Sequence, residues 1–261
     1  MNRSLPLLFP LLLLAGCAAS SSQPPAAPAI YLLGEVHDNP AGHERRLSFI
    51  RSKVEAGWRP AMAMEQFDRE HQAALDGAMV SCKDADCVIK AASGNARWEW
   101  KLYKPVIELA LEFKLPLLAA NLSRADAGKV MRDGFAAALD GATIQSYRLD
   151  QPLPAALVSG QVQAIKDGHC NMLPEAMAPG MVRAQVARDV VMAQVVAAHA
   201  QRGVVLLAGN GHVRNDVGVP QWLGVKAVSI GYTEAAAGQF DKNEVVAAQA
   251  RPDQCAQFKA G

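Results

Sequence analysis

The sequence predicts an α/β domain with a mostly parallel central sheet and helices on both faces. Five short apolar runs do not alternate with polar residues, which is typical of strands that are buried on both faces of a parallel sheet. Segments with helical signals lie between these runs, and alternating strands and helices favour such a sheet. The predicted strands are Ile30–Leu33, Ala61–Met64, Leu115–Ala119, Val204–Ala208 and Lys226–Ile230.

The predicted helices are recognised by their end signals and their apolar spacing. One begins at Asn39-Pro40 and runs to Gly57, because proline suits the first helical turn and glycine suits the position after the last. Another begins at Ser123, whose side chain can cap the turn that contains Asp126. The segments Trp98–Phe113 and Met181–His199 are also predicted to be helical. Residues 136–178 have weaker patterns, so we expect a helical and loop insertion there.

Residues 1–16 resemble the signal peptide of an exported lipoprotein. Arg3 supplies positive charge, and the leucine-rich segment 5–14 is too short to be a comfortable membrane span. The segment ends in Leu14-Ala15-Gly16-Cys17, which resembles the bacterial lipobox, where the chain is cleaved before the cysteine and the cysteine receives lipid. We therefore expect lipidation of Cys17, with an ordinary signal peptide and a chance cysteine as the alternative.

Residues 17–29 are predicted to be the lipidated cysteine and a flexible tether, because small, polar and proline residues cannot form a core. The lipid would hold residues 30–261, a single domain, at a membrane surface without spanning it. Ala18 is not Asp, which resembles the sorting pattern for the outer membrane. We therefore expect the protein at the periplasmic face of that membrane.

The charge and the cysteines restrict the classes of partner. Removal of residues 1–16 takes away only Arg3, so 26 basic residues become 25, against 25 acidic ones. A charge near zero gives no reason to expect nucleic acid. In an oxidising compartment we expect two disulfides rather than a four-thiolate metal site, because the C-x-x-C spacing is absent. The expected pairs are Cys82 with Cys87 and Cys170 with Cys255.

Polar residues follow the predicted strands at their carboxyl ends. Ligands of open parallel sheets bind outside these ends, so we expect the side chains to converge on one cleft. His37 and His212 share the pattern Gly-x-x-His, which favours a functional role for both. By contrast, Asp38 or Asn39 is predicted to cap a helix, and His43 and His71 are predicted to be solvated. The cleft residues, in strand order, are Glu35 and His37, Glu65, Asn121, Asn210 and His212, and Tyr232.

Two further features are ambiguous from the sequence. Trp98 and Trp100 cannot share one helix face, so the aromatic segment at residues 98–105 is either a ligand wall or a helix start with one buried tryptophan. His169 precedes a predicted disulfide cysteine and is either directed at a ligand or merely exposed.

Six motifs occur in order between residues 30 and 232. They are Gly34-Glu35-Val36-His37-Asp38-Asn39-Pro40, Glu65-Gln66-Phe67, Trp98-x-Trp100-x-x-Tyr103-x-Pro105, Ala119-Ala120-Asn121-Leu122, Gly168-His169-Cys170, and Gly209-Asn210-Gly211-His212-Val213 followed by Gly218-Val219-Pro220. Together they resemble the ChaN family of iron-regulated, haem-binding lipoproteins. That family resembles a wider superfamily with the Tiki metalloproteases and erythromycin-esterase-like hydrolases, which share two Gly-x-x-His motifs.

The resemblance implies a role in haem or iron uptake, with haem bound through a tyrosine and two haems face to face in a homodimer. A haem receptor is a further partner that it suggests. Tyrosinate is a hard, anionic ligand that suits ferric iron. Tyr103 is our first choice of ligand and Tyr232 the second, because Tyr31 lies inside a strand and Tyr147 in a weakly patterned region. The candidates for contacts with the propionates are His37, His169, His212 and Lys101.

The resemblance leaves a second function open. Neutral imidazoles of His37 and His212, with Glu35 or Glu65, could hold a divalent metal and activate water. The same groups could instead act as a metal-free acid and base in a hydrolase. We favour a binding protein over an enzyme. We also favour a haem-binding protein over a scaffold that only binds another protein.

Overall fold

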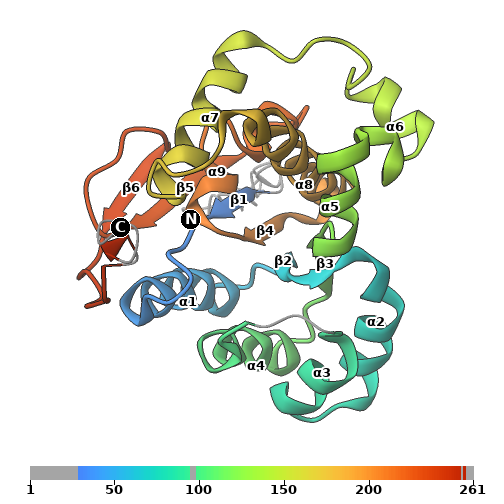
Figure 1. Cartoon of the computed structure of the whole chain (residues 1–261). Coiled ribbons are helices and arrows are strands. Elements are labelled where there is room, and N and C mark those ends of the chain that lie inside the picture. The colour runs from blue at the N-terminus through green and yellow to red at the C-terminus, as the bar shows by residue number, and fades with distance from the viewer. Residues whose placement is uncertain (1–28, 95–97, 254, 257–261) are drawn as a thin grey trace, which may run out of the picture.

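The computed structural model describes residues 29–94, 98–253 and 255–256 of the chain (Figure 1). The predicted signal peptide, the predicted lipidation site Cys17 and nearly all of the predicted tether lie outside these ranges. None of the helices in the described ranges is both long enough and apolar enough to cross a bilayer.

The centre of the fold is a six-stranded sheet with the order β3-β2-β4-β1-β5-β6, and every pair of neighbouring strands is parallel. The α/β prediction is confirmed, and the mostly parallel sheet proves to be parallel throughout the described residues. The strands are β1 (Ile30–Leu33), β2 (Ala61–Asp68), β3 (Leu117–Asn121), β4 (Val204–Leu207), β5 (Val228–Thr233) and β6 (Lys242–Val245).

Three features of the strands differ from the sequence prediction. Tyr232 lies inside β5, which continues to Thr233, and not after its end. β6 was not predicted, because its residues Lys-Asn-Glu-Val form a half-exposed edge strand without an apolar run. β2 continues beyond Met64 to Asp68, so Glu65 lies inside this strand and not after its end. An irregularity in the pairing of β2 with β3 falls between Met64 and Asp68.

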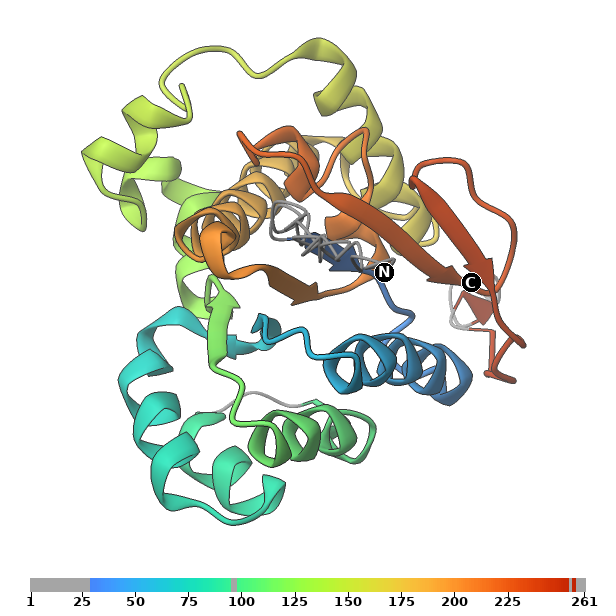
Figure 2. The same ribbon diagram turned by 180° about the vertical axis from the view of Figure 1, so that it is seen from behind.

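Helices cover both faces of the sheet, as Figures 1 and 2 show from opposite sides. One face carries α1 (Pro40–Glu55), α2 (Gln72–Ser81), α3 (Ala85–Ala92) and α4 (Lys104–Glu112). The other face carries α5 (Arg124–Asp133), α7 (Ala155–Gly168), α8 (Ala178–Ala198) and α9 (Asn210–Val213). The predicted insertion contains α6 (Gly141–Ser146) and α7. The predicted helix at Trp98–Phe113 begins only at Lys104, where Pro105 occupies its first turn.

The core consists of two apolar layers, one on each face of the sheet. Neighbouring residues of a strand point to opposite faces, so Leu33 packs toward α1 and α4 while Leu32 packs toward α8. Both layers are apolar, which explains why the central strands appear in the sequence as continuous apolar runs.

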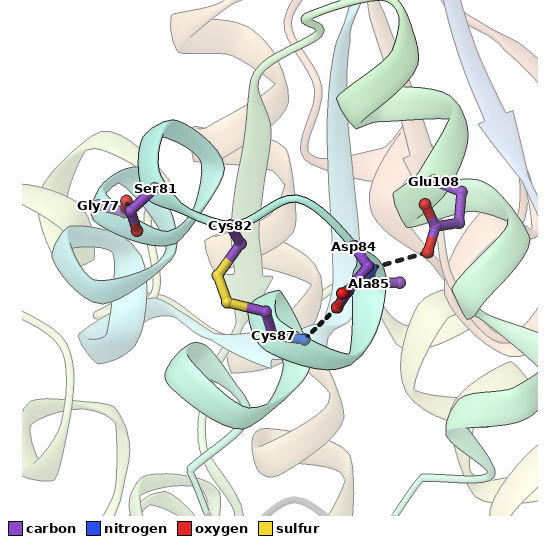
Figure 3. Close-up of a disulfide and its surroundings, with 7 residues drawn as sticks. All are labelled: Gly77, Ser81, Cys82, Asp84, Ala85, Cys87 and Glu108. Atoms are coloured by element: carbon purple, nitrogen blue, oxygen red, sulfur yellow. Dashed lines mark hydrogen bonds between the residues drawn. A yellow bond between two sulfur atoms is a disulfide. The ribbon is translucent and has the colours of Figure 1, made fainter.

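Both predicted disulfides are present. Cys82–Cys87 closes the loop between α2 and α3 (Figure 3), where Asp84 caps α3 by accepting a hydrogen bond from the Cys87 amide at 2.8 Å. The Ala85 amide also donates to Glu108 of α4 at 2.8 Å. Cys170–Cys255 joins the residue just after α7 to the C-terminal part of the chain.

The loop after β1 is bound to the C-terminal segment, residues 247–253. Arg251 forms ion pairs with Asp38 at 2.5 Å and with Glu234 at 2.7 Å. Asn39 donates to the Ala247 carbonyl at 2.8 Å and caps α1 by accepting from the Gly42 amide at 2.9 Å. Of the two predicted cap residues, Asn39 is therefore the cap, and Asp38 instead forms an ion pair with Arg251.

Candidate functional site

The strand register places the two Gly-x-x-His motifs side by side. β1 and β4 are neighbours with Leu33 opposite Leu207, so both chains leave the sheet at the same edge. Beyond the strands, the backbone N–H of Asn210 donates a hydrogen bond to the backbone carbonyl of Glu35 at 2.9 Å. β2 lies on the other side of β4 with Met64 opposite Leu207, which brings Glu65 to the same edge. The structure therefore brings together residues that lie far apart in the sequence.

Glu35 is the centre of a buried polar cluster. Its carboxylate accepts hydrogen bonds from the Tyr103 hydroxyl at 2.5 Å and from His37 Nδ1 at 2.8 Å, and it forms an ion pair with the fully buried Arg46. Burial raises the pKa of Glu35, but Arg46 and the hydrogen bond from His37 outweigh it and lower this pKa to about 2. Glu35 is therefore an anion at neutral pH.

His37 is oriented by Glu35. Its side chain is 49% exposed, and its Nδ1 faces the Glu35 carboxylate, so Nε2 is the nitrogen left for a ligand or a proton. Burial lowers the pKa of His37, but the carboxylates of Glu35 and Glu65 outweigh burial and raise it. The space for this ring exists because residue 209 is glycine: a β-carbon on Gly209 would lie 3.0 Å from the ring.

His43 belongs to the same cluster, so the prediction that it is solvated was wrong. Its side chain is only 6% exposed. Nε2 donates to the His37 carbonyl at 3.0 Å and Nδ1 accepts from Arg46 at 3.1 Å, which fixes a neutral ring. Burial, together with the charge of Arg46, lowers the pKa of His43 and keeps the ring neutral. Arg46 is therefore positioned by His43 as well as by Glu35.

His212 has a carboxylate at each ring nitrogen. Nδ1 donates to the buried Asp189 of α8 at 2.6 Å, and Nε2 lies 3.6 Å from Glu65 Oε1. The other Glu65 oxygen accepts from the Gly209 amide at 2.7 Å. Burial lowers the pKa of His212, but Glu65 and Asp189 outweigh burial and raise it. Burial raises the pKa of Asp189 to about 6, although His212 opposes this shift.

A cleft of about 440 Å³ lies at this edge of the sheet, and the predicted residue Glu65 does not line it but contacts Gly209 and His212, which do. His37 and His212 lie in its wall, and His169 at the end of α7 lines it from the other side. The sequence left open whether His169 faces a ligand, and the structure places it in the cleft with its Nδ1 donating to the Ile165 carbonyl at 2.7 Å. Two further predicted residues, Glu35 and Asn210, also line this cleft.

The remaining predicted residues lie outside this cleft. Tyr103 is fully buried behind Glu35, and Tyr232 is 1% exposed in the same apolar layer. The exposed Lys101 pairs with Glu99 at 2.8 Å. Asn121 lines a neighbouring cavity. Trp98 and Trp100 both pack partly against the core, and the Trp98 ring lies 5.0 Å from the His37 ring.

Two charged residues that enter the cluster from helices, Arg46 and Asp189, were not predicted from the sequence. Arg46 shares one face of α1 with the buried Ile50 and Val54, and Asp189 lies within the buried apolar stripe of α8. A charge on an apolar helical face is the signal that could have identified both. Within the described ranges, no group of three or more His, Cys, Asp or Glu side chains is arranged to hold a metal ion.

The fold and the cleft define a class of α/β proteins that place acid–histidine pairs at the carboxyl edge of a parallel sheet. The chain belongs to the family described as haem-binding uptake, Tiki superfamily, ChaN, whose sequence model matches residues 26–223. Haem is thereby the cofactor that the family assigns to this chain.

Solved structures agree with this fold. The chain is similar to ChaN of Campylobacter jejuni, described as having cofacial haem binding, with a TM-score of 0.66 and 22% identity over 82% of this chain and 86% of that one. It is more distantly similar to an erythromycin esterase mutant in its open conformation, with a TM-score of 0.44 and 17% identity over 78% of this chain and 70% of that one. No protein with a curated description matches the chain.

Proposed function

We propose that this protein is a lipoprotein of the outer membrane that binds haem for haem or iron uptake, through a tyrosine at a dimer interface. The observation that carries the proposal is the family match over residues 26–223. The lipobox at Leu14–Cys17 supports the anchor, and the cofacial haem described for the Campylobacter jejuni structure supports a dimer. A haem receptor would be the partner that delivers or accepts the haem.

The four tyrosines differ in how accessible they are to a haem iron. Burial raises the pKa of the Tyr103, Tyr232 and Tyr147 hydroxyls alike, but Tyr103 and Tyr232 are in addition fully enclosed, which keeps them from a haem iron. Tyr31 packs edge-on against Phe49 and Trp58. Tyr147 is half-buried at the end of α6, in the helical insertion. We therefore favour Tyr147 as the ligand, because a haem at Tyr103 would have to break the hydrogen bond to Glu35.

An apolar groove between α7 and α8 suits the haem ring. It measures about 400 Å³ and is lined by apolar side chains such as Leu153, Val162 and Val182. Lys166 and Arg183 also line it, and cations beside an apolar surface match a macrocycle that carries two propionates. Arg183 donates one hydrogen bond to the Met131 carbonyl at 2.9 Å, while its buried Nε has no partner in the described structure. The residues of this groove therefore fit the haem ring and its propionates, while the proposed ligand Tyr147 lies outside the groove lining.

The test is a haemin titration of protein lacking residues 1–17, followed by visible spectroscopy, with size-exclusion chromatography in parallel. We expect a saturable tyrosinate-type ferric spectrum and a shift from monomer to dimer. Tyr147→Phe should abolish this spectrum, and Tyr103→Phe, the matched control, should retain it. The reverse result would restore Tyr103 as the ligand. A wild-type protein without a saturable spectrum would exclude haem binding.

A specific observation favours a second function, acid–base hydrolysis in the cleft. The Nδ1 atoms of His37 and His212 each face a carboxylate, and both rings line the same cleft. Nε2 of His37 is left to accept or donate a proton, while Nε2 of His212 lies 3.6 Å from Glu65 Oε1, with which it can exchange one. No metal-holding group occurs among the described side chains, so the metal-free form of this alternative fits the geometry better. A screen of ester substrates would test it: turnover that is lost in His37→Ala supports hydrolysis, and no turnover by the wild type excludes it for esters.

A further inference from the structure

A second cavity, which we call the β2–β3 cavity, lies beside the cleft and has no part in the functions proposed above. It measures about 810 Å³ and opens where β2 and β3 end and α5 begins. Trp98 lines this cavity, and its ring lies 5.0 Å from the ring of His37, which lines the cleft. In a parallel sheet this edge is where ligands bind.

One part of the cavity suits an anion. Arg124 and Arg188, from two different helices, both line it. The N-terminus of the ten-residue helix α5 opens into it at Arg124 and Ala125. Ser123 caps this helix by accepting from the Asp126 amide at 3.3 Å, which leaves the amides of Arg124 and Ala125 without intrahelical acceptors. Two guanidinium groups and the N-terminus of α5 therefore border the same cavity.

Another part of the cavity suits hydroxyl groups. Asn121 is 5% exposed and is fixed at both ends: its Oδ1 accepts from Arg188 at 2.9 Å and its Nδ2 donates to Asp68 Oδ1 at 2.9 Å. Asp68 keeps its second carboxylate oxygen for another donor. Glu70 and His71 also line the cavity. Carboxylates would repel a bare anion but would accept hydrogen bonds from a ligand that carries hydroxyls as well as a negative charge.

Trp98 supplies a flat apolar surface in this polar surrounding. The ring is half-buried and makes an edge-to-face contact with Tyr103, whose ring centre lies 5.8 Å away. A sugar ring combines the features that these three regions fit: an apolar face of C–H groups, several hydroxyls and, in acidic sugars, a charged substituent.

We propose that the β2–β3 cavity binds a sugar that carries an anionic group, either a carboxylate or a phosphate. The Trp98 ring packs against one face of the sugar, Asp68 and Asn121 bind its hydroxyls, and Arg124 and Arg188 bind the anion. This site is independent of haem, since the groove between α7 and α8 shares no lining residue with it.

The test uses the full-length protein in detergent and follows tryptophan fluorescence during titration. The probes are glucuronate, glucose 6-phosphate, glucose, inorganic phosphate and haemin. We expect saturable binding of one or both charged sugars, and binding of glucose and of inorganic phosphate weaker by at least about tenfold, because each lacks one set of contacts. The stronger of the two charged sugars identifies the anion.

Matched variants locate the site. Arg124→Ala should weaken binding of the charged sugar by about tenfold or more. The control is Lys129→Ala: Lys129 is an exposed cation of the same helix that does not line the cavity, so its loss should not change the affinity. Asp68→Asn should weaken binding of the sugars and leave binding of inorganic phosphate unchanged. The proposal is overturned if neither charged sugar saturates, if inorganic phosphate binds as tightly as either, if Lys129→Ala matches Arg124→Ala, or if haemin displaces the sugar.

Discussion

The Tyr103 hydroxyl donates a 2.5 Å hydrogen bond to the Glu35 carboxylate, and neither group reaches the solvent to any large extent. This tyrosine was the first candidate for a haem ligand in the sequence, and in the structure its hydroxyl stabilises a buried anion. The bond therefore ties the aromatic segment before α4 to the residue that orients His37.

Tyr103 and Tyr232 are predicted to respond differently to loss of their hydroxyls. Tyr103→Phe removes a donor from a buried carboxylate, so we expect a loss of about 1–3 kcal/mol in the free energy of unfolding. Tyr232→Phe removes a buried hydroxyl that has no partner in the described structure, so it should be neutral or stabilising. Urea denaturation of the two variants measures both effects. Equal losses would contradict the assignment of the hydrogen bond.

The Glu35–Arg46 pair predicts a loss of stability in acid. The pKa of Glu35 falls from its ordinary value of 4.5 to about 2 in the folded protein. A depressed carboxyl pKa contributes stability above the unfolded value, and this contribution disappears as the pH falls from 4.5 to 2. The shift corresponds to roughly 3 kcal/mol.

The reference for this measurement is the double variant Glu35→Gln/Arg46→Met, which removes both charges at once. A single Glu35→Gln change would leave the buried Arg46 unpaired and cost about 3–5 kcal/mol. We expect the free energy of unfolding of the wild type to fall more steeply between pH 4.5 and 2 than that of the double variant. If the free energies of unfolding of the two proteins change in parallel with pH, Glu35 is not the cause of the loss of stability in acid.

Much of the fold can be predicted from the sequence because local patterns decide it. The predicted strand Ile30–Leu33 begins and ends at the same residues as β1. At Asn39-Pro40, a side-chain cap and a proline in the first turn begin α1, as predicted. Patterns fail where tertiary contacts decide instead. β6 is polar and pairs with only one strand, and β2 continues through Glu65-Gln66 because those polar side chains bond within the cluster.

The site can be predicted only where its residues follow a strand. His37 and His212 are recognisable from glycine, spacing and a preceding apolar run. Arg46, His43 and Asp189 come from helices, where an isolated polar residue more often faces solvent than a buried partner. Their positions depend on which helix packs over which strand end, and no pattern within one helix contains that information.

Asp189 is predicted to control the protonation of His212. Glu65 and Asp189 both raise the pKa of His212 against the effect of burial. Asp189→Asn removes one of these charges and keeps the shape of the side chain, so the pKa of His212 should fall. The pH dependence of the histidine ring signals in NMR measures this change, and the His43 signals serve as the internal control because that ring bonds to Arg46 and the His37 carbonyl and not to Asp189 or His212. An unchanged His212 pKa would mean that Glu65 alone sets it.

The two disulfides are predicted to contribute unequally to stability. Cys170 and Cys255 are 85 residues apart, whereas Cys82 and Cys87 are 5 apart (Figure 3). A longer closed loop restricts the unfolded chain more, which gives roughly 4–5 kcal/mol for the first bond and roughly 2 kcal/mol for the second. Urea denaturation of the double variants Cys170→Ser/Cys255→Ser and Cys82→Ser/Cys87→Ser measures the difference.

The C-terminal segment also contains Arg251, which forms ion pairs with Asp38 and Glu234, so this segment keeps native contacts without the Cys170–Cys255 disulfide. A larger loss from the Cys82–Cys87 pair would show that native packing around α2 and α3 outweighs loop entropy.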